Sequence, residues 1–269
     1  MAGNQPQAVL VSGAKGSGKA ATALYLAQIL LGKQTLENYP YWLHIAPANK
    51  TISIAEIRSI NDFLKRKTVG KGQLRRVIVI EDADAMTTEA QNSLLKNLEE
   101  PPADTVVILT ASDPQSLLAT IRSRVQTIEV LTLSLETLKA TLGKEHQAKT
   151  IEQAYYISDG RVGLALALLD NNQEHELLAA INEAKSLLKA SRYERLALIN
   201  QLNEPGKVNV LLEGLLCITR SGLKLATNSG DTVRSKTYLN LVAAVNAAQR
   251  QISKNVSAKL VLTNLFLTL

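Results

Sequence analysis

Residues 92–125 read NSLLKNLEEPPADTVVILTASDPQSLLATIRSRV, and this stretch decides the expected fold. It joins an amphipathic helical pattern, a Pro-Pro stop, a continuous apolar run and an Ile-Arg-Ser-Arg ending. Pro101 and Pro102 end the helix, because proline lacks an N–H and clashes with the preceding turn. The run 106–110 shows no polar alternation, which is typical of a parallel strand covered on both faces. The stretch therefore predicts part of an α/β sheet.

Four further segments have the composition of buried strands, at 8–11, 42–45, 77–80 and 127–130. Helical patterns separate them, and the first of these stops at Gly32, a good C-terminal cap residue. Ser53 with Glu56, and Thr88 with Gln91, have the spacing of capping boxes. Because strands alternate with helices, we expect βαβ units and a three-layer α/β domain with a parallel five-stranded sheet.

No strand-like pattern follows residue 130. Residues 133–170 favour a small helical group, and apolar residues recur at three- and four-residue spacing from about residue 173 onward. The polar segment DNNQ at 170–173 is the expected linker between the two helical parts. The sequence thus predicts an α/β domain at 1–132, a small helical domain at 133–171 and an all-helical domain at 172–269.

The composition excludes several classes of protein. The 269 residues, 46% of them hydrophobic and 20% charged, match a globular chain with a sizeable core. No apolar run approaches the roughly 18 residues that span a bilayer, and the start MAGNQPQ has no secretory signal pattern. Cys217, the only cysteine, excludes an intramolecular disulfide and a multi-cysteine zinc module, and is expected to be a small buried apolar residue. We expect a cytoplasmic protein without a metal site.

The net charge of +6 permits contact with a polyanion without proving it. Beyond residue 206 only Glu213 and Asp231 oppose eight basic residues. The eight are Lys207, Arg220, Lys224, Arg234, Lys236, Arg250, Lys254 and Lys259. A second basic run consists of Lys65, Arg66, Lys67, Lys71, Arg75 and Arg76. Few aromatic residues interleave with these charges, so stacking on bases is not expected. A solvated surface and loose contact with DNA phosphates both stay open.

A phosphate-binding loop is expected at residues 13–20, which read GAKGSGKA. The frame G-x-x-x-x-G-K lies between an expected strand and an expected helix, which is the context that makes the motif credible. Gly13, Gly16 and Gly18 allow backbone N–H groups to turn inward and cradle phosphate. The helix N-terminus adds its positive dipole, and the Lys19 ammonium reaches the outer phosphates.

These motifs resemble the AAA+ subunits of clamp loaders, whose central segment runs roughly N-A-L-L-K-x-L-E-E-P-P, a strand, then T-I-x-S-R-C. Within that family the chain is most similar to the delta-prime subunits of the bacterial DNA polymerase III clamp loader. The resemblance is strong over about residues 1–170. It implies an AAA+ module built from a P-loop domain and a helical lid, followed by an all-helical C-terminal collar that joins the subunits.

Three departures from the family pattern predict weak or absent ATP hydrolysis. Ala20 replaces the Ser or Thr whose hydroxyl coordinates Mg²⁺. Glu81-Asp82 reverses the Asp-Glu order of active relatives, and a misplacement of about 1 Å costs on the order of a hundredfold in rate. A simple role as caps of a strand end stays open for both acids. Gly163 stands where active relatives carry a phosphate-sensing arginine, and Arg161 lies out of register.

The nucleotide is therefore expected to be dispensable. No cofactor should be required, and ATP or ADP bound without hydrolysis is left open because Lys19 is retained. Ser112 also stands near the strand end where the family senses phosphate, so a residual phosphate contact stays possible there.

Ser123-Arg124 retains the Ser-Arg pair of the family, although Val125 replaces the usual Cys. In ring-forming AAA+ subunits this arginine projects into the ATP site of the neighbour. It stabilises transition-state charge and is worth roughly 10³–10⁵ in rate. Arg124 is thus the predicted catalytic residue, acting in trans as an arginine finger. A non-hydrolysing site beside an intact finger implies a stator, with no ATPase activity of its own.

The resemblance also implies partners and alternatives. The partners are ATPase subunits of the gamma/tau type, a delta-type subunit and, through the assembly, the sliding clamp and primed DNA, with no membrane. One alternative is an active ATPase resembling gamma/tau, favoured by Lys19 and opposed by Ala20 and Gly163. A stand-alone DNA-binding protein that uses the basic C-terminal helices is the other.

Overall fold

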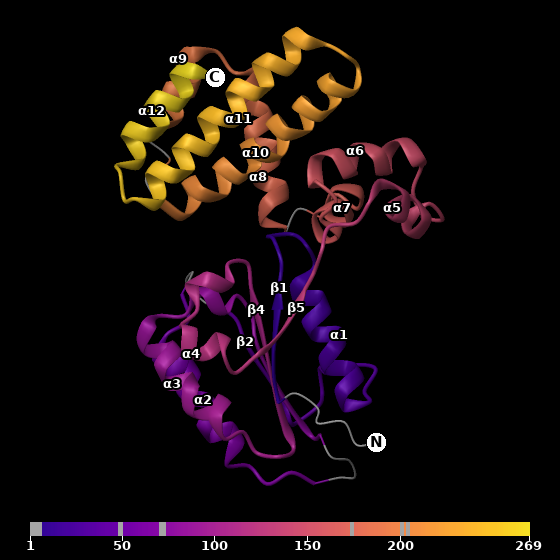
Figure 1. The fold of residues 1–269 in the computed structure, drawn as a ribbon, viewed down its shortest axis with the longest axis vertical. Coiled ribbons are helices and arrows are strands. Elements are labelled where there is room, and N and C mark those ends of the chain that lie inside the picture. Colours follow the sequence, from indigo (N-terminus) through magenta and orange to yellow (C-terminus); the bar gives the residue numbers. More distant parts are fainter. Residues whose placement is uncertain (1–6, 48–50, 70–73, 173–174, 200–201, 203–204) are drawn as a thin grey trace. The chain divides into compact units, whose positions relative to one another are not determined.

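The computed structural model describes residues 7–47, 51–69, 74–172, 175–199, 202 and 205–269. The chain forms two compact units, Met1–Leu131 and Thr132–Leu269 (Figure 1). Strands occur only in the first unit among the described residues, whereas the described part of the second unit is helical. The predicted division at 170–173 falls partly on residue 173, which lies outside the described residues, and the separation of lid from collar stays a prediction.

The first unit contains a parallel five-stranded sheet with the order β2-β3-β4-β1-β5. Its strands are β1 (Ala8–Ser12), β2 (Trp42–Ile45), β3 (Arg76–Ile80), β4 (Thr105–Ala111) and β5 (Gln126–Glu129). Every residue of β1, β3 and β4 is buried, as their continuous apolar runs predict. The predicted parallel α/β sheet is therefore confirmed.

Helices cover both faces of the central strands. They are α1 (Lys19–Leu31), α2 (Ile54–Leu64), α3 (Thr88–Glu99) and α4 (Ala119–Arg122), with short turns η1 (Ala83–Ala85) and η2 (Pro114–Ser116). Helix α1 packs with one core cluster, which contains Val9, Val79 and Ile108, and α2 and α3 pack on the opposite face with Leu10, Ile78 and Leu109 (Figure 1). Alternate residues of the central strands β1, β3 and β4 thus pack into the two cores on opposite faces of the sheet.

Strand β5 departs from the prediction of five buried strands. All four of its residues are exposed, including Ile128. Strand β5 pairs with β1 at the edge of the sheet, while α1 packs over β1, β3 and β4. An edge strand outside the reach of its covering helix stays in solvent, whatever its apolar content. The segment that follows Arg124 is therefore an exposed sheet edge.

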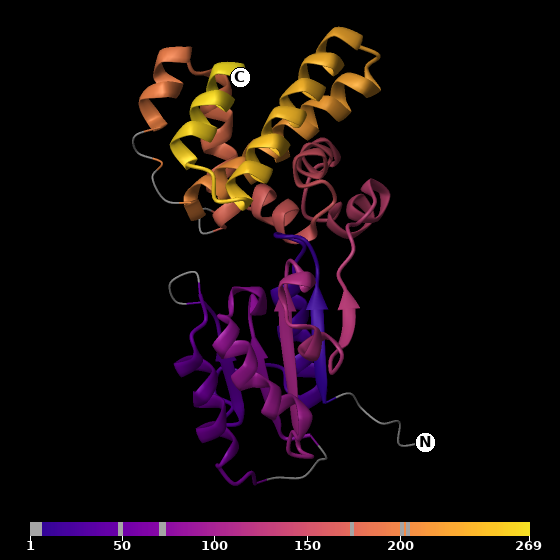
Figure 2. The same cartoon turned by 60° about the vertical axis from the view of Figure 1, so that its left-hand side comes forward.

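The second unit consists of α5 (Leu135–Leu142), α6 (Ala148–Ser158), α7 (Val162–Leu169), α8 (Glu176–Lys189), α9 (Arg192–Leu198), α10 (Pro205–Asn228), α11 (Thr232–Ser253) and α12 (Ala258–Thr268). Helix α10 packs against both α8 and α11, and these helices share a core with α12 (Figure 2). Helix α6 also packs on α10, and α7 contacts α8. In the part of the chain that the structure describes, no helix is long and apolar enough to cross a membrane.

Local capping signals are borne out in one case and wrong in the other. Ser53 and Glu56 form the predicted capping box at the start of α2. At α3 the cap residue is Thr87, whose hydroxyl accepts from the Ala90 N–H. Gln91 is instead buried and joins the segment after β4 to α3, because its side-chain oxygen accepts from the Leu118 N–H. A buried amide with several backbone partners is satisfied there better than at a helix end.

Candidate functional site

The predicted phosphate loop connects β1 to α1 with the geometry that the motif requires. Gly16 and Gly18 have φ angles of 77° and 92°, a region that glycine adopts at little cost. Gly13 donates its N–H to the Ala111 carbonyl at 3.2 Å, and a Cβ there would lie 2.7 Å from the Ser17 hydroxyl. That hydroxyl is buried and has no hydrogen-bond partner among the described residues. The loop thus retains an unsatisfied polar group of the kind that a bound phosphate oxygen satisfies.

Lys19 is the first residue of α1, and it forms an ion pair with a carboxylate of the same chain. Only 8% of Lys19 is exposed, and its Nζ lies 3.2 Å from Oδ1 of Asp82. Asp82 follows β3 in the left-handed region, with φ at 46°, which Asp tolerates better than most residues. Its N–H donates to the Thr110 hydroxyl at 2.9 Å, which fixes this conformation. A phosphate at Lys19 therefore competes with Asp82.

Glu81 points to a different partner from Asp82. Its N–H continues the sheet by donating to the Ile45 carbonyl, and its carboxylate lies 3.0 Å from Nε2 of His44. His44 stacks on Trp42 in β2, with ring centroids 5.7 Å apart. The two adjacent acids thus diverge, one toward the phosphate loop and one toward the sheet edge. No sequence motif marks His44 as a partner of Glu81, and the available signal was its place in β2, the strand that pairs with β3.

The residues at the loop fit a phosphate better than they fit a magnesium ion. Ala20 supplies no oxygen, and the Thr22 hydroxyl donates to the Gly18 carbonyl at 3.0 Å on its own helix. Among the residues that the structure describes, no three His, Cys, Asp or Glu side chains gather as metal ligands. The backbone of the loop, Ser17 and Lys19 are the groups that would hold a nucleotide phosphate. The role of these residues in nucleotide binding stays a prediction.

Asp84 connects the ends of two strands, a role that no sequence motif predicted. Its Oδ2 accepts from the N–H groups of Ser112 and Asp113, at 3.0 and 3.1 Å, so that the turn after β3 is tied to the end of β4. Its Oδ1 and the Ser112 hydroxyl are both buried without a hydrogen-bond partner among the described residues. Ser112 thus lies where the sequence placed a phosphate contact, but its backbone is engaged by Asp84.

Arg124 lies just beyond the short helix α4 and is partly exposed. Its Nη2 lies 2.7 Å from Oε1 of Glu99, the last residue of α3. Its Nη1 donates to the Thr120 carbonyl at 2.9 Å and to the Ser123 hydroxyl at 3.3 Å. The guanidinium is therefore held on the surface, where it remains accessible to another molecule. No local sequence pattern indicates Glu99 as the partner of Arg124.

Arg161 has the opposite environment, in the second unit. It is 7% exposed, and its guanidinium donates to the Ser158 carbonyl at 2.7 Å, to Glu213 at 3.0 Å and to the Cys217 sulfur at 2.9 Å. Glu213 and Cys217 belong to α10, so Arg161 ties the start of α7 to that helix. Gly163, which the sequence motif predicts to stand in place of the family's phosphate-sensing arginine, lies in the first turn of α7 and has no side chain. Arg161 is thus engaged in a structural cluster.

Cys217 is buried, as the sequence predicts, and only 4% of it is exposed. Burial raises the pKa of its thiol, and the nearby Arg161 opposes that rise only in part. A thiol of raised pKa is a poor nucleophile at neutral pH, because the thiolate is the reactive form. Cys217 is therefore part of the helical packing.

The second basic run is not a uniformly solvated patch. Arg76 is buried and pairs with Asp104 at 3.1 Å, while Arg75 lies 3.7 Å from the same carboxylate. Burial alone would raise the pKa of Asp104, but the Thr68 hydroxyl and Arg76 outweigh it and lower that pKa. Lys71 lies outside the described residues. Arg76 is therefore not available to contact DNA phosphates, because it is buried and Asp104 neutralises its charge.

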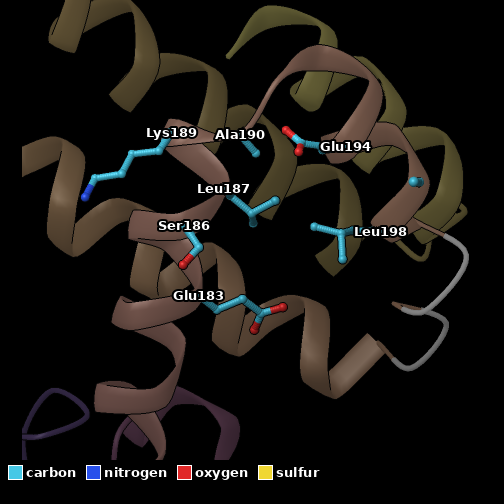
Figure 3. A pocket seen from close by; sticks show the side chains of 8 residues that line it. Glu183, Ser186, Leu187, Lys189, Ala190, Glu194 and Leu198 are labelled. Carbon is cyan, nitrogen blue, oxygen red and sulfur yellow. The ribbon is translucent and has the colours of Figure 1, made fainter.

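A groove of about 810 Å³ lies between α8 and α9. Its wall carries the apolar side chains of Leu187 and Leu198 and the carboxylates of Glu183 and Glu194 (Figure 3). None of the predicted site residues contributes to it. The sequence did not indicate this groove, since its apolar residues are those of ordinary amphipathic helices.

Comparisons with known proteins agree with the fold and the motifs. A family model described as "DNA polymerase III, delta subunit" matches residues 1–134. The chain is 30% identical to the DNA polymerase III subunit delta' of Escherichia coli, covering 78% of this chain and 69% of that protein. It is 25% identical to the corresponding subunit of Bacillus subtilis, over 97% of this chain and 90% of the relative. The fold resembles a gamma subunit-related protein of DNA polymerase III from Thermotoga maritima, with a TM-score of 0.56, 20% identity and coverage of 98% and 94%.

Proposed function

This chain belongs to the DNA polymerase III delta' family of clamp-loader subunits, and from that membership we propose that it is the non-catalytic stator of its complex. In this role it hydrolyses no ATP itself and supplies Arg124 to the ATP site of a neighbouring subunit. Its partners are ATPase subunits of the gamma/tau type and a delta-type subunit, with the sliding clamp and primed DNA reached through the assembly. The predicted C-terminal collar joins these subunits.

The contrast between Lys19 and Arg124 carries the proposal. Lys19 is nearly buried and faces Asp82, the following Ala20 has no hydroxyl, and Glu81 faces His44. Arg124 is exposed, and within the described part of the chain its partners are Glu99, the Thr120 carbonyl and the Ser123 hydroxyl. A guanidinium keeps its charge at all relevant pH values and matches the fork geometry of phosphate oxygens. The chain is therefore better equipped to assist hydrolysis elsewhere than to perform it.

The phosphate loop has a reduced role in this proposal. Its backbone, the Ser17 hydroxyl and Lys19 still suit a phosphate, so ATP or ADP can bind without being hydrolysed. A bound nucleotide would supply a fixed negative charge that draws Lys19 away from Asp82. No cofactor is required for the stator role, because Arg124 acts on the nucleotide of the neighbour.

The decisive experiment is ATP turnover by a complex reconstituted with the cognate ATPase and delta-type subunits. We expect Arg124→Ala to lower turnover strongly, while the isolated chain shows none. Arg122→Ala is the matched control, because Arg122 is the last residue of α4, two positions before Arg124, and its guanidinium donates to Gln115. Equal turnover by both variants would remove the finger from the mechanism.

The active-ATPase alternative has one observation in its favour, the intact loop with Lys19 at the start of α1. Steady turnover of Mg-ATP by the isolated chain, abolished by Lys19→Ala, would support it. If the chain is a stator, we expect the isolated chain to show no turnover of Mg-ATP, with or without the substitution.

A further inference from the structure

The guanidinium of Arg124 is held by a carboxylate placed at a defined point of the fold. Glu99 is the last residue of α3, since Glu100 is the C-cap and Pro101 and Pro102 follow it, so that the helix cannot continue. Its Oε1 lies 2.7 Å from Nη2 of Arg124, while Nη1 of Arg124 bonds to groups of α4 and its end. Helices α3 and α4 pack against each other, which keeps the two charges in register.

The pair is weak enough to exchange. The side chains of Arg124 and Glu99 are 35% and 49% exposed, so solvent screens their attraction. A carboxylate offers a guanidinium the same fork of oxygens that a phosphate offers. Glu99 thus places a phosphate-like group on the arginine before any nucleotide of a neighbour arrives.

The next residue gives a natural contrast. Glu100 has the same side chain and is exposed, and among the described residues no ion pair joins its carboxylate to a cation. Its backbone N–H caps the helix through the Lys96 carbonyl. Of two adjacent glutamates, only the first therefore meets the arginine.

We propose that Glu99 is a positioning residue that holds Arg124 against α3 and α4 and yields it to the phosphate of a neighbouring subunit's nucleotide. This inference rests on the proposed function, because it requires Arg124 to act in trans. The carboxylate keeps the guanidinium from sampling other orientations, and it competes with the incoming phosphate for the same N–H groups. Glu99 sets the nucleotide concentration at which the finger engages.

The test measures ATP turnover against ATP concentration in the reconstituted complex, with Glu99→Gln, Glu100→Gln, Arg124→Ala and the double variant Glu99→Gln/Arg124→Ala. Glutamine keeps the size of the side chain and removes its charge. We expect Glu99→Gln to lower KM about two- to fivefold with little change in kcat, the size expected of one exposed ion pair. Glu100→Gln should change neither constant, and the effect of Glu99→Gln should vanish when Arg124 is absent.

The outcomes separate the two proposals. If Arg124→Ala lowers turnover but Glu99→Gln behaves like Glu100→Gln, the finger stands and the role of Glu99 is overturned. If Glu99→Gln lowers kcat as Arg124→Ala does, Glu99 assists the reaction instead of competing with phosphate, and the inference is also overturned. If Arg124→Ala has no effect, the proposed function fails, and the inference fails with it.

Discussion

Two arginines of this chain, Arg124 and Arg161, lie close to helix ends inside segments that resemble clamp-loader motifs, yet their surroundings differ completely. Arg124 is partly exposed, and it is held by a solvent-accessible glutamate, the Thr120 carbonyl of α4 and the Ser123 hydroxyl just after that helix. Arg161 is 7% exposed, and Ser158, Glu213 and Cys217 surround it. The first guanidinium can leave its partners at small cost, whereas the second cannot.

The difference shows how burial assigns a role to a charged side chain. An exposed ion pair contributes about 0–1 kcal/mol, so its arginine remains available to another molecule. A buried arginine that loses its partners, or that leaves them, uncovers unsatisfied polar groups, and the cost rises to several kcal/mol. Arg124 is therefore suited to act on a neighbour, and Arg161 is suited to hold α7 against α10.

The largest expected effect on turnover is at Arg124, whose exposed ion pair contributes little to the free energy of unfolding. In the reconstituted complex, Arg124→Lys should lower turnover at the site that this chain completes by on the order of a hundredfold, because lysine keeps the charge but loses the planar fork. The free energy of unfolding, measured with urea, should stay within about 0.5 kcal/mol of the native value. A large loss of stability in this variant would contradict the contrast between the two arginines.

The reverse pattern is expected for the second arginine. Arg161→Met keeps a long side chain but strands Glu213 and the Ser158 carbonyl, so the free energy of unfolding should fall by about 2–3 kcal/mol. Arg220→Met, a change in an exposed residue of α10, is the control and should stay within about 0.5 kcal/mol. Denaturation curves of both variants decide this, and equal stabilities would show that the buried cluster adds no net stability.

The fold could be predicted because its signals are local. Five strand-like runs separated by helical patterns predicted the five strands and their parallel pairing. Continuous apolar runs predicted the burial of β3 and β4. The exposure of β5 could not be predicted, since it depends on how far α1 reaches across the sheet. The cap of α3 was misplaced by one residue because Thr87 and Thr88 have equivalent side chains.

The site was only partly predictable for a related reason. The glycines and Lys19 of the loop follow from one contiguous motif, and the structure brings them together at the end of β1. The partners of the other charged side chains are distant in sequence. His44 and Glu81 are 37 residues apart, and Arg161 and Glu213 are 52 apart. Single side chains of common types carry no local signal for such pairing. The tertiary fold alone shows that Arg161 is occupied and Arg124 is accessible.

A smaller effect is expected at the phosphate loop. If the chain is a stator, Lys19→Ala should leave the turnover of the reconstituted complex unchanged, because no step of hydrolysis depends on this loop. The comparison with Arg124→Ala in the same preparation makes the result informative. A loss of turnover with intact complex assembly, followed by size-exclusion chromatography, would mean that the loop binds a nucleotide that the complex needs.

The smallest effect concerns His175, which lies in the electrostatic field of Arg161. Burial, and then the charge of Arg161, lower the pKa of His175 in the folded protein. The unfolded chain therefore binds a proton at a higher pH, near 6.5, than the folded chain does. Stability from this residue is fully present above that pH and declines as the pH falls through it.

We expect the free energy of unfolding to drop less between about pH 8 and about pH 5.5 in His175→Gln than in the native chain. His146→Gln, at a histidine that faces Asp170, controls for general acid effects, and in the Arg161→Met background the advantage of His175→Gln should shrink because part of the field is gone.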